Sequence, residues 1–320
     1  MQVTTEHIQP YDANRDAADV YALWQAALSS EWPLTQERLQ KVLNGNEPQH
    51  FVARINGKIV GFVATLKRSY GAEKVGQLLA LLIHPDVQRQ GIGTALHAAA
   101  LEHFRSHGLT SVRLGSVSPR FWCGVPDNLP GALAFFQGRG WDLSTTVYDL
   151  AQDLTTYQTP ERVIQRLHQE KITIASAQNK NVTDVLAFEA KHFANWLPQY
   201  EICADLGDYR DLLVARDEDG RILGTLIMYS STQSHPERTD LIWQDLLGEQ
   251  AGAMSAVGVA ESERGRGIGI ALVAGASEIL KERGTTNCFI DWVELTDFYA
   301  KLGYDKWRSY HPSVRDLANL

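Results

Sequence analysis

The chain has few cysteines, and the three that it has lie far apart, at Cys123, Cys203 and Cys288. An odd number of scattered cysteines excludes the disulfide framework that stabilises small secreted domains, and the spacing does not fit a structural zinc site. The ten histidines are scattered too, with no H-E-x-x-H pattern. We therefore expect reduced thiols and no metal site.

Long apolar runs and an excess of positive charge are also absent. No apolar stretch is long enough to cross a bilayer, and residues 1–6 lack the basic and then apolar regions of a signal peptide. We expect a cytoplasmic protein without a membrane partner. The net charge of −8 argues against nucleic acid as the main partner. It favours a neutral or cationic substrate over an anionic one.

Two short glycine-rich loops stand out from this ordinary composition. Residues 88–93 read Gln-Arg-Gln-Gly-Ile-Gly, and residues 264–269 read Arg-Gly-Arg-Gly-Ile-Gly. Each follows an apolar run typical of a buried strand and precedes a helical pattern. Glycine lets the backbone approach an anion closely, while the first amides and the dipole of a helix attract negative charge. Both loops therefore predict a phosphate cradle, to which arginine adds charge-assisted hydrogen bonds.

The spacing of these loops excludes two common nucleotide-binding motifs. It is [QR]-x-x-G-x-G rather than G-x-G-x-x-G, and no acidic residue follows where a ribose would need one. No Gly-Lys-Ser/Thr follows either, which excludes a P-loop. A glycine-rich turn without a ligand would explain one copy, but two copies in matching contexts favour a function.

The loops belong to a longer internal repeat. Residues 51–61 and 213–224 both read as hairpins, the first around an Asn-Gly turn. Gly61 and Gly224 are 163 positions apart (224 − 61), as are Gly140 and Gly303 (303 − 140). The loop glycines Gly91 and Gly267 are 176 apart (267 − 91). The second half therefore has about 13 additional residues near 230–252, and the first half as many near 116–128.

A repeat this long predicts two domains rather than a solenoid. We predict an N-terminal domain over residues 1–153, a linker over 154–170 and a C-terminal domain over 171–320. Within the linker, Thr159 and Pro160 are typical of the N-cap and the first turn of a short helix.

The loops, together with the order strand, helices, hairpin, strand, loop, helix, strand, helix, strand, resemble the GNAT acetyltransferases. The resemblance implies an α/β fold of two tandem GNAT domains, each a mixed, mostly antiparallel sheet flanked by helices. It also implies acetyl-CoA as the cofactor, and leaves open whether each domain binds one. The implied cofactor-binding residues are Leu82, Ile83, Gln88, Arg89, Gln90, Gly91, Ile92, Gly93 and Thr94 in the first half, and Val257, Gly258, Val259, Arg264, Gly265, Arg266, Gly267, Ile268 and Gly269 in the second.

One tyrosine distinguishes the halves. In GNAT enzymes a tyrosine within a phrase similar to F-Y-x-x-x-G-[FY] protonates the leaving thiolate, and Tyr299 stands at that position. The first half has Phe136 there, which cannot donate a proton. The resemblance thus implies that the C-terminal half is the catalyst and that the N-terminal half is non-catalytic or holds a structural CoA. The alternative for Tyr299 is an aromatic ring that only packs beneath the sheet.

Two carboxylates between the last strands of the second half are candidates for the general base. Asp291 and Glu294 lie where the resemblance places the acetyl group, and either could accept the ammonium proton directly or through water. We prefer Asp291. The alternative is that both only cap or charge the start of a helix.

The acceptor is implied by resemblance alone. Tandem GNAT families include mycothiol synthase and glucosamine or glucosaminide N-acetyltransferases, and residues 121–136 are similar to the second group. This implies a small-molecule amine, an amino sugar, for which Trp32, Trp122, Trp196 and Trp292 are possible stacking platforms or ordinary packing residues. Another small amine, a protein amine and a CoA-binding regulatory module without turnover stay open. The sequence does not indicate an oligomeric state.

Overall fold

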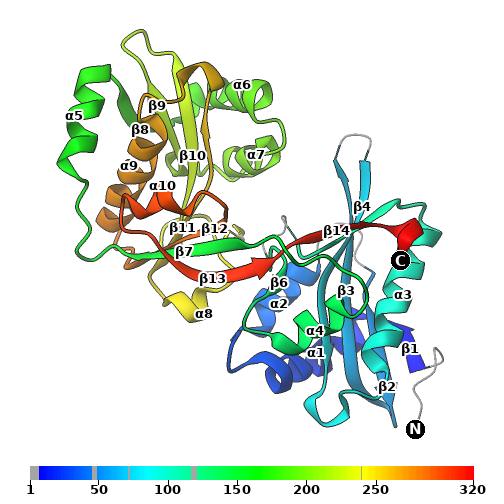
Figure 1. The fold of residues 1–320 in the computed structure, drawn as a ribbon. Helices are drawn as coiled ribbons and strands as arrows, with labels where there is room; N and C mark the ends of the chain where they lie inside the picture. Colours follow the sequence, from blue (N-terminus) through cyan, green and yellow to red (C-terminus); the bar gives the residue numbers. More distant parts are fainter. Residues whose placement is uncertain (1–6, 45–48, 71–72, 117–120, 239) are drawn as a thin grey trace. The chain divides into compact units, whose positions relative to one another are not determined.

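The computed structural model describes residues 7–44, 49–70, 73–116, 121–238 and 240–320. By their internal contacts the chain divides into two compact units, drawn in Figure 1. The first unit takes residues 1–147 and 309–320, and the second takes residues 148–308. Each unit is a mixed sheet with helices, which confirms the predicted fold class.

The first unit is built on a sheet of strand order β1-β2-β3-β4-β5-β14, in which only β4 and β5 run parallel. Its strands are β1 (Ile8–Pro10), β2 (Phe51–Ile55), β3 (Lys58–Tyr70), β4 (Glu73–Ile83), β5 (Ser111–Leu114) and β14 (Ser313–Asp316), with the short β6 (Val125–Pro126) apart from this sheet. Its helices are α1 (Ala13–Leu28), α2 (Gln36–Leu43), α3 (Ile92–Ser106) and α4 (Pro130–Gln137).

The second unit repeats this plan with strand order β13-β7-β12-β11-β10-β9-β8, in which β11 and β12 are the parallel pair. Its strands are β7 (Val147–Asp153), β8 (Thr173–Ser176), β9 (Leu212–Arg216), β10 (Ile222–Ser230), β11 (Ala251–Val259), β12 (Asn287–Val293) and β13 (Asp305–His311). Its helices are α5 (Glu161–Glu170), α6 (Val182–His192), α7 (Leu197–Asp205), α8 (Gln244–Leu247), α9 (Ile268–Glu282) and α10 (Thr296–Ala300).

The predicted hairpins are present in both units. Asn56 and Gly57 connect β2 to β3 with φ angles of 50° and 77°, the left-handed conformation that a tight two-residue turn requires. The turn between β9 and β10 contains Gly220 at a φ of 80°.

The unit boundaries differ from the predicted ones at two strands. β7 lies in the predicted N-terminal domain, yet it pairs antiparallel with β12 of the second unit. β14 lies in the predicted C-terminal domain, yet it pairs with β5 of the first unit. Each unit thus takes one strand from the other half of the sequence. The predicted linker, residues 154–170, belongs to the second unit.

The start of α5 also differs from the prediction. The amide and hydroxyl of Thr159 both donate to the Glu278 carboxylate of α9, at 2.7 and 2.8 Å, so Thr159 does not cap α5. Pro160 is the N-cap residue instead, without a side-chain hydrogen bond. The connector is therefore tied to α9 rather than to its own helix.

The core of the second unit has two parts, one on each face of the sheet. α9 covers one face, where Leu226 and Met254 lie among the buried residues. α6 and α7 cover the other face, where Tyr200 packs with Val214 and Ile227. Alternation along β9 and β10 sends successive side chains to opposite faces, as the pleat of a strand requires.

The tryptophans of the first unit serve its core. Trp24 and Trp122 stack with ring centroids 5.4 Å apart, and Trp32 meets Trp122 edge to face at 5.6 Å. Trp32 and Trp122 are buried, at 0% and 4% exposure. They are packing residues rather than platforms for a ligand.

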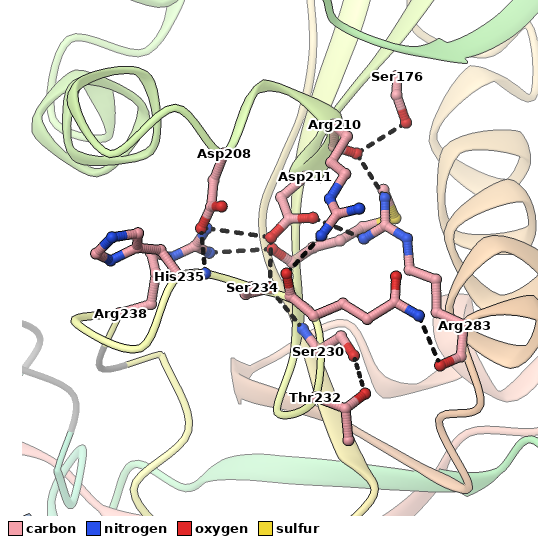
Figure 2. A network of polar contacts seen from close by, with 12 residues as sticks. Ser176, Asp208, Arg210, Asp211, Ser230, Thr232, Ser234, His235, Arg238 and Arg283 are labelled. Carbon is pink, nitrogen blue, oxygen red and sulfur yellow. Dashed lines mark hydrogen bonds and ion pairs between the residues drawn. The ribbon is translucent and has the colours of Figure 1, made fainter.

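A buried ionic network attaches the insertion of residues 230–252 to the second unit. Figure 2 shows the carboxylates of Asp208 and Asp211 pointing toward the Arg238 guanidinium, which lies 3.2 and 3.4 Å from them. Arg238 also donates to Asp240 at 2.6 Å and to the Met228 carbonyl at 3.0 Å. Because Arg238 is almost fully buried, its charge depends on these partners.

Replacing Arg238 by methionine should therefore destabilise the second unit strongly. The change removes the Arg238 cation from the carboxylates of Asp208, Asp211 and Asp240, of which Asp211 still pairs with Arg283 at 2.6 Å. We expect a loss of about 3–5 kcal/mol in the free energy of unfolding. Urea unfolding followed by circular dichroism measures it. Lys171→Met is the matched control, because its pair with Glu218 at 2.9 Å is exposed and should contribute about 1 kcal/mol or less. Equal losses in the two variants would contradict the role of the network.

Candidate functional site

The candidate site of the second unit begins where its two parallel strands part. β11 and β12 stay in register from the Ala251–Asn287 pair to the Met254–Ile290 pair. Beyond that point β11 continues to Val259 and β12 to Val293 without pairing to each other. Unpaired backbone groups of Ser255 to Val259 therefore become available to a ligand between the strands.

A bulge in β11 lies at this opening. Ser255 pairs with Ile227 and Gly258 with Thr225, so Ala256 and Val257 together oppose the single residue Leu226. Ala256 has a φ of 49°, an uncommon conformation for a residue with a side chain. Such bulges leave a peptide outside the ladder and often occur next to functional sites.

The glycine after the bulge is required by close packing. A Cβ atom on Gly258 would lie 2.6 Å from the Phe193 ring, which is closer than real contacts allow. Phe193 in turn stacks on Trp196, with ring centroids 5.0 Å apart and an interplanar angle of 20°. Trp196 is half-buried, so this aromatic pair lies beside the strand at the predicted acyl site.

The second glycine-rich loop has the geometry of an anion cradle. Gly265 and Gly267 have φ angles of 83° and 84°, and Gly267 is the N-cap of α9 without a side-chain cap. The first amides of α9 therefore have no side-chain acceptor at the cap, as a pyrophosphate site requires. The side chain of Ile268 is buried, so only its backbone is available. Arg264 is exposed beside the loop.

Arg266 lies in a different environment from the one expected of a phosphate ligand. Its guanidinium pairs with Glu170 at 2.8 Å and with Glu263 at 2.5 Å. The hydrogen bond to Glu170 and that to Glu263 raise the pKa of Arg266, because both carboxylates stabilise its charge. A neutralised arginine attracts a phosphate less than a free one does. In this structure Arg266 joins the loop to α5.

Tyr299 and Asp291 lie close together at the end of β12. Burial and, second to it, the charge of Asp291 together raise the pKa of the Tyr299 hydroxyl to about 12. The phenol therefore stays protonated throughout the physiological range. Tyr299 comes from α10 and packs against the core on the α9 face. The structure thus brings together the predicted acid and one of the two predicted bases.

A second bulge shapes the end of β12. Ile290 pairs with Leu150 and Val293 with Tyr148, so two residues, Asp291 and Trp292, oppose Asp149. Trp292 has a φ of 51°, and its amide donates to the Asp149 carboxylate at 3.2 Å. Asp149 is buried at 2% exposure. The other predicted base, Glu294, follows the strand and is exposed.

Asp149 is a site residue that sequence reasoning missed. It lies on β7, within the predicted N-terminal domain, and no motif surrounds it. Only the pairing of β7 with β12 places it beside Asp291. An alternating strand after the first repeat was visible in the sequence, but its partner was not.

The first unit has an open cavity at the corresponding position. About 570 Å³ of space lies between its glycine-rich loop, the end of β4 and α4. The predicted residues that line it are Leu82, Ile83, Gln88, Arg89, Gly91, Ile92, Gly93 and Thr94, whereas Gln90 is exposed outside the lining. Phe136 also lines the cavity, where the second unit has Tyr299.

The two cradles differ in charge and strain. Arg89 has a φ of 62° at the position where the second loop has Gly265. Arg139 lines the same cavity, lies over the Phe135 ring with its Cζ 3.6 Å from the centroid, and donates to Thr94. In the second unit, Leu302 stands at the position of Arg139 and Ile270 at the position of Thr94. The first cradle therefore has two cations of its own.

Neither a membrane-spanning helix nor a metal-binding cluster is present in the part of the chain that the structure describes. No helix in the described ranges is long and apolar enough to cross a membrane. In the same ranges, no group of three or more histidine, cysteine, aspartate or glutamate side chains is arranged to hold a metal ion.

Comparisons with known proteins agree with the repeat. A model of the acetyltransferase (GNAT) family matches residues 17–140 and again residues 180–304. A fungal multi-domain β-N-acetylglucosaminidase contains a region described as a GCN5-related glucosamine N-acetyltransferase. It is 43% identical, with a TM-score of 0.92 over 96% of this chain and 38% of the fungal one.

More distant relatives share the tandem layout. Mycothiol acetyltransferase of Parafrankia sp. is 24% identical over 277 residues, 81% of each chain. A tandem GNAT protein from the clavulanic acid biosynthesis pathway shares the fold at 18% identity and a TM-score of 0.65, over 97% of this chain and 98% of that one. An uncharacterized N-acetyltransferase of Methanocaldococcus jannaschii is 31% identical over 32% of this chain and 42% of its own length. The matched regions span well under two thirds of the fungal and Methanocaldococcus proteins.

Proposed function

The chain belongs to the acetyltransferase (GNAT) family, and from this premise we propose that it transfers the acetyl group of acetyl-CoA to the primary amine of an amino sugar. The observation that carries the acceptor is the 43% identity, over 96% of this chain, to a region described as a glucosamine N-acetyltransferase. We place the reaction in the second unit, because Tyr299 lies there and Phe136 takes its place in the first.

The residues of the second unit fit acetyl-CoA, which supplies an activated acetyl thioester when bound. The left-handed glycines Gly265 and Gly267 leave the first amides of α9 open to the pyrophosphate, with Arg264 beside them. The strand from Val257 to Val259 offers backbone groups to the pantetheine arm. The amide of Val257 is the donor that we assign to the carbonyl oxygen, on which negative charge develops during attack.

Tyr299 is the group that we assign to the leaving sulfur. Its raised pKa keeps the proton in place until the thiolate forms, so it acts as a hydrogen-bond donor first and an acid second. Asp291, next to it, is the preferred acceptor for the ammonium proton, and Glu294 is the solvent-exposed alternative. The amine of an amino sugar is less basic than that of lysine, so a carboxylate acting through water suffices.

The cavity of the first unit supports a second acyl-CoA site without turnover. Arg89 and Arg139 line it, and a phenylalanine faces it where a proton donor would be needed. We propose that this unit binds CoA and does not catalyse.

Replacing Tyr299 by phenylalanine tests the acid. We expect turnover to fall by about a hundredfold, because proton donation to the sulfur is lost, while the Kd for acetyl-CoA stays within twofold. Thiol release with glucosamine and calorimetric titration with acetyl-CoA measure the two quantities. A variant with full turnover would refute the assignment of Tyr299.

Replacing the loop glycines by tryptophan separates the two cradles. Gly267→Trp should abolish turnover, since the side chain would fill the pyrophosphate site of the second unit, whereas Gly91→Trp should lower only the number of acetyl-CoA molecules bound. Gly220→Trp is the control, because Gly220 has the same left-handed φ, 80°, in a hairpin turn. Turnover that survives Gly267→Trp but not Gly91→Trp would move catalysis to the first unit.

A panel of amines tests the acceptor. With acetyl-CoA we expect selective turnover of glucosamine or its oligomers over an aminoglycoside, spermidine, the mycothiol precursor and a lysine peptide. Thiol release at equal amine concentrations gives the ratio of kcat/KM values. Turnover of the mycothiol precursor instead would favour the function of the Parafrankia relative, and CoA binding without turnover of any amine would favour a regulatory module.

A further inference from the structure

A buried polar chain ends on the bulge of β11. The Tyr200 hydroxyl of α7 donates to the Ala256 carbonyl at 3.0 Å. Glu189 of α6 accepts a hydrogen bond from the Thr225 hydroxyl of β10, and Thr225 pairs with Gly258, the residue that follows the bulge. All three side chains, of Glu189, Tyr200 and Thr225, are 0% exposed.

The three side chains are close enough to influence one another. The Glu189 charge raises the pKa of the Tyr200 hydroxyl, second to burial itself, and a hydrogen bond with Thr225 opposes that rise. Thr225 therefore lies within reach of both Glu189 and Tyr200. The second carboxyl oxygen of Glu189, Oε2, has no hydrogen-bond partner among the residues that the structure describes.

A carboxyl group in this position is expensive for the fold. Burial raises the pKa of Glu189 to about 7, because the ionised form is poorly solvated. A leucine of similar size would pack against the same neighbours without that desolvation cost. Packing alone therefore does not explain why a glutamate is present at position 189. Its hydrogen bond is with Thr225, which lies next to the bulge.

The carbonyl at the end of the chain belongs to the peptide that the reaction uses. In a planar trans peptide the N–H of Val257 points opposite to the carbonyl of Ala256. Tyr200 holds that carbonyl toward the face covered by α6 and α7, so the Val257 amide points away from that face. This bond holds the peptide that follows the left-handed Ala256.

We propose, on the basis of the function proposed above, that Tyr200 is a positioning residue. It fixes the Ala256–Val257 peptide so that the Val257 amide donates to the thioester carbonyl. Glu189 and Thr225 hold the Tyr200 hydroxyl in place. These residues act through the backbone and do not touch the substrate.

The first unit supports this assignment by contrast. The counterpart of Thr225, at the same offset of 163 (225 − 62), is Phe62, and the counterpart of Tyr299 is Phe136. The bulge of β4 lies at Leu79, between the Ala64–Ala80 and Thr65–Leu78 pairs. Leu79 and its neighbours Leu78 and Ala80 do not have a positive φ. The unit that lacks the proton donor thus also lacks a left-handed residue at its bulge.

The test compares acetyl-CoA with S-ethyl-CoA, which has the same length but no carbonyl oxygen. Both are titrated by calorimetry into a full-length chain carrying Gly91→Trp, so that only the second unit binds. One hydrogen bond to the carbonyl predicts about a fivefold preference for acetyl-CoA. In the Tyr200→Phe variant we expect the preference to fall below twofold while S-ethyl-CoA binds as before.

The matched control is Tyr304→Phe. Tyr304 is buried too in the same unit, and its hydroxyl contacts the side chains of Ser277 at 2.8 Å and Met254 at 3.9 Å rather than a peptide of the bulge. This variant loses a buried hydrogen bond too, but should keep the fivefold preference. The same preference in Tyr200→Phe as in the parent, or an equal fall in Tyr304→Phe, would overturn the proposal.

Two substitutions at Glu189 test whether this carboxyl group helps to hold the Tyr200 hydroxyl. Glu189→Gln keeps an oxygen acceptor for Thr225 and should keep the preference, whereas Glu189→Leu should reduce it as Tyr200→Phe does. If both variants show the same preference for acetyl-CoA over S-ethyl-CoA, Glu189 has no part in positioning Tyr200. None of these measurements uses an amine, so failure of the amino-sugar acceptor would leave them unchanged, whereas no binding of acetyl-CoA to the parent would overturn the proposed function itself.

Discussion

The site of the second unit depends on the bulge in β11. Register with β10 requires two residues, Ala256 and Val257, opposite one, and this mismatch bends the strand just beyond its last pairing with β12. The bend opens the space between the parallel strands, and it also removes a peptide from the ladder. One local irregularity thus accounts for both the room and the backbone donor that we propose for the thioester. The aromatic pair of Phe193 and Trp196 covers the next residue, Gly258, and excludes any larger side chain there.

The two units place different side chains on one framework, in line with the proposal that the first binds CoA and the second catalyses. Both keep a glycine-capped helix after the splayed strand, since Gly91 and Gly267 have φ angles of 85° and 84°. The first unit has Arg89 and Arg139 in its cavity and Phe136 in place of the tyrosine, whereas the second neutralises Arg266 with carboxylates and has Tyr299. Tight phosphate binding and rapid exchange of cofactor make opposite demands on a cradle. The arginines in the first cavity suit tight phosphate binding, and the paired Arg266 of the second unit suits rapid exchange of the cofactor.

Short sequence patterns predicted the features that depend on neighbouring residues. The loops, the Asn-Gly hairpin and the aromatic phrase around Tyr299 each depend on a few neighbouring residues, so the sequence was sufficient to place them. Strand exchange was not predictable, because the order of β7 and β14 along the chain agrees with either pairing. Asp149 and Glu170 were missed for the same reason, since their partners Trp292 and Arg266 lie about 100 or more positions away. The polar contacts from Glu189 to Ala256 likewise join four elements, α6, α7, β10 and β11, that no sequence motif connects.

Asp291 is our proposed base because of how Asp291 and Tyr299 affect each other. A carboxylate beside a phenol raises the pKa of the phenol, and at Tyr299 this adds to the effect of burial. A proton that moves from the amine to Asp291 removes that negative charge, and the phenol then becomes a stronger acid. Deprotonation of the acceptor would thus prepare the donor for the leaving sulfur. Glu294, exposed and beyond the strand, cannot couple to Tyr299 in this way, and this difference favours Asp291 as the base.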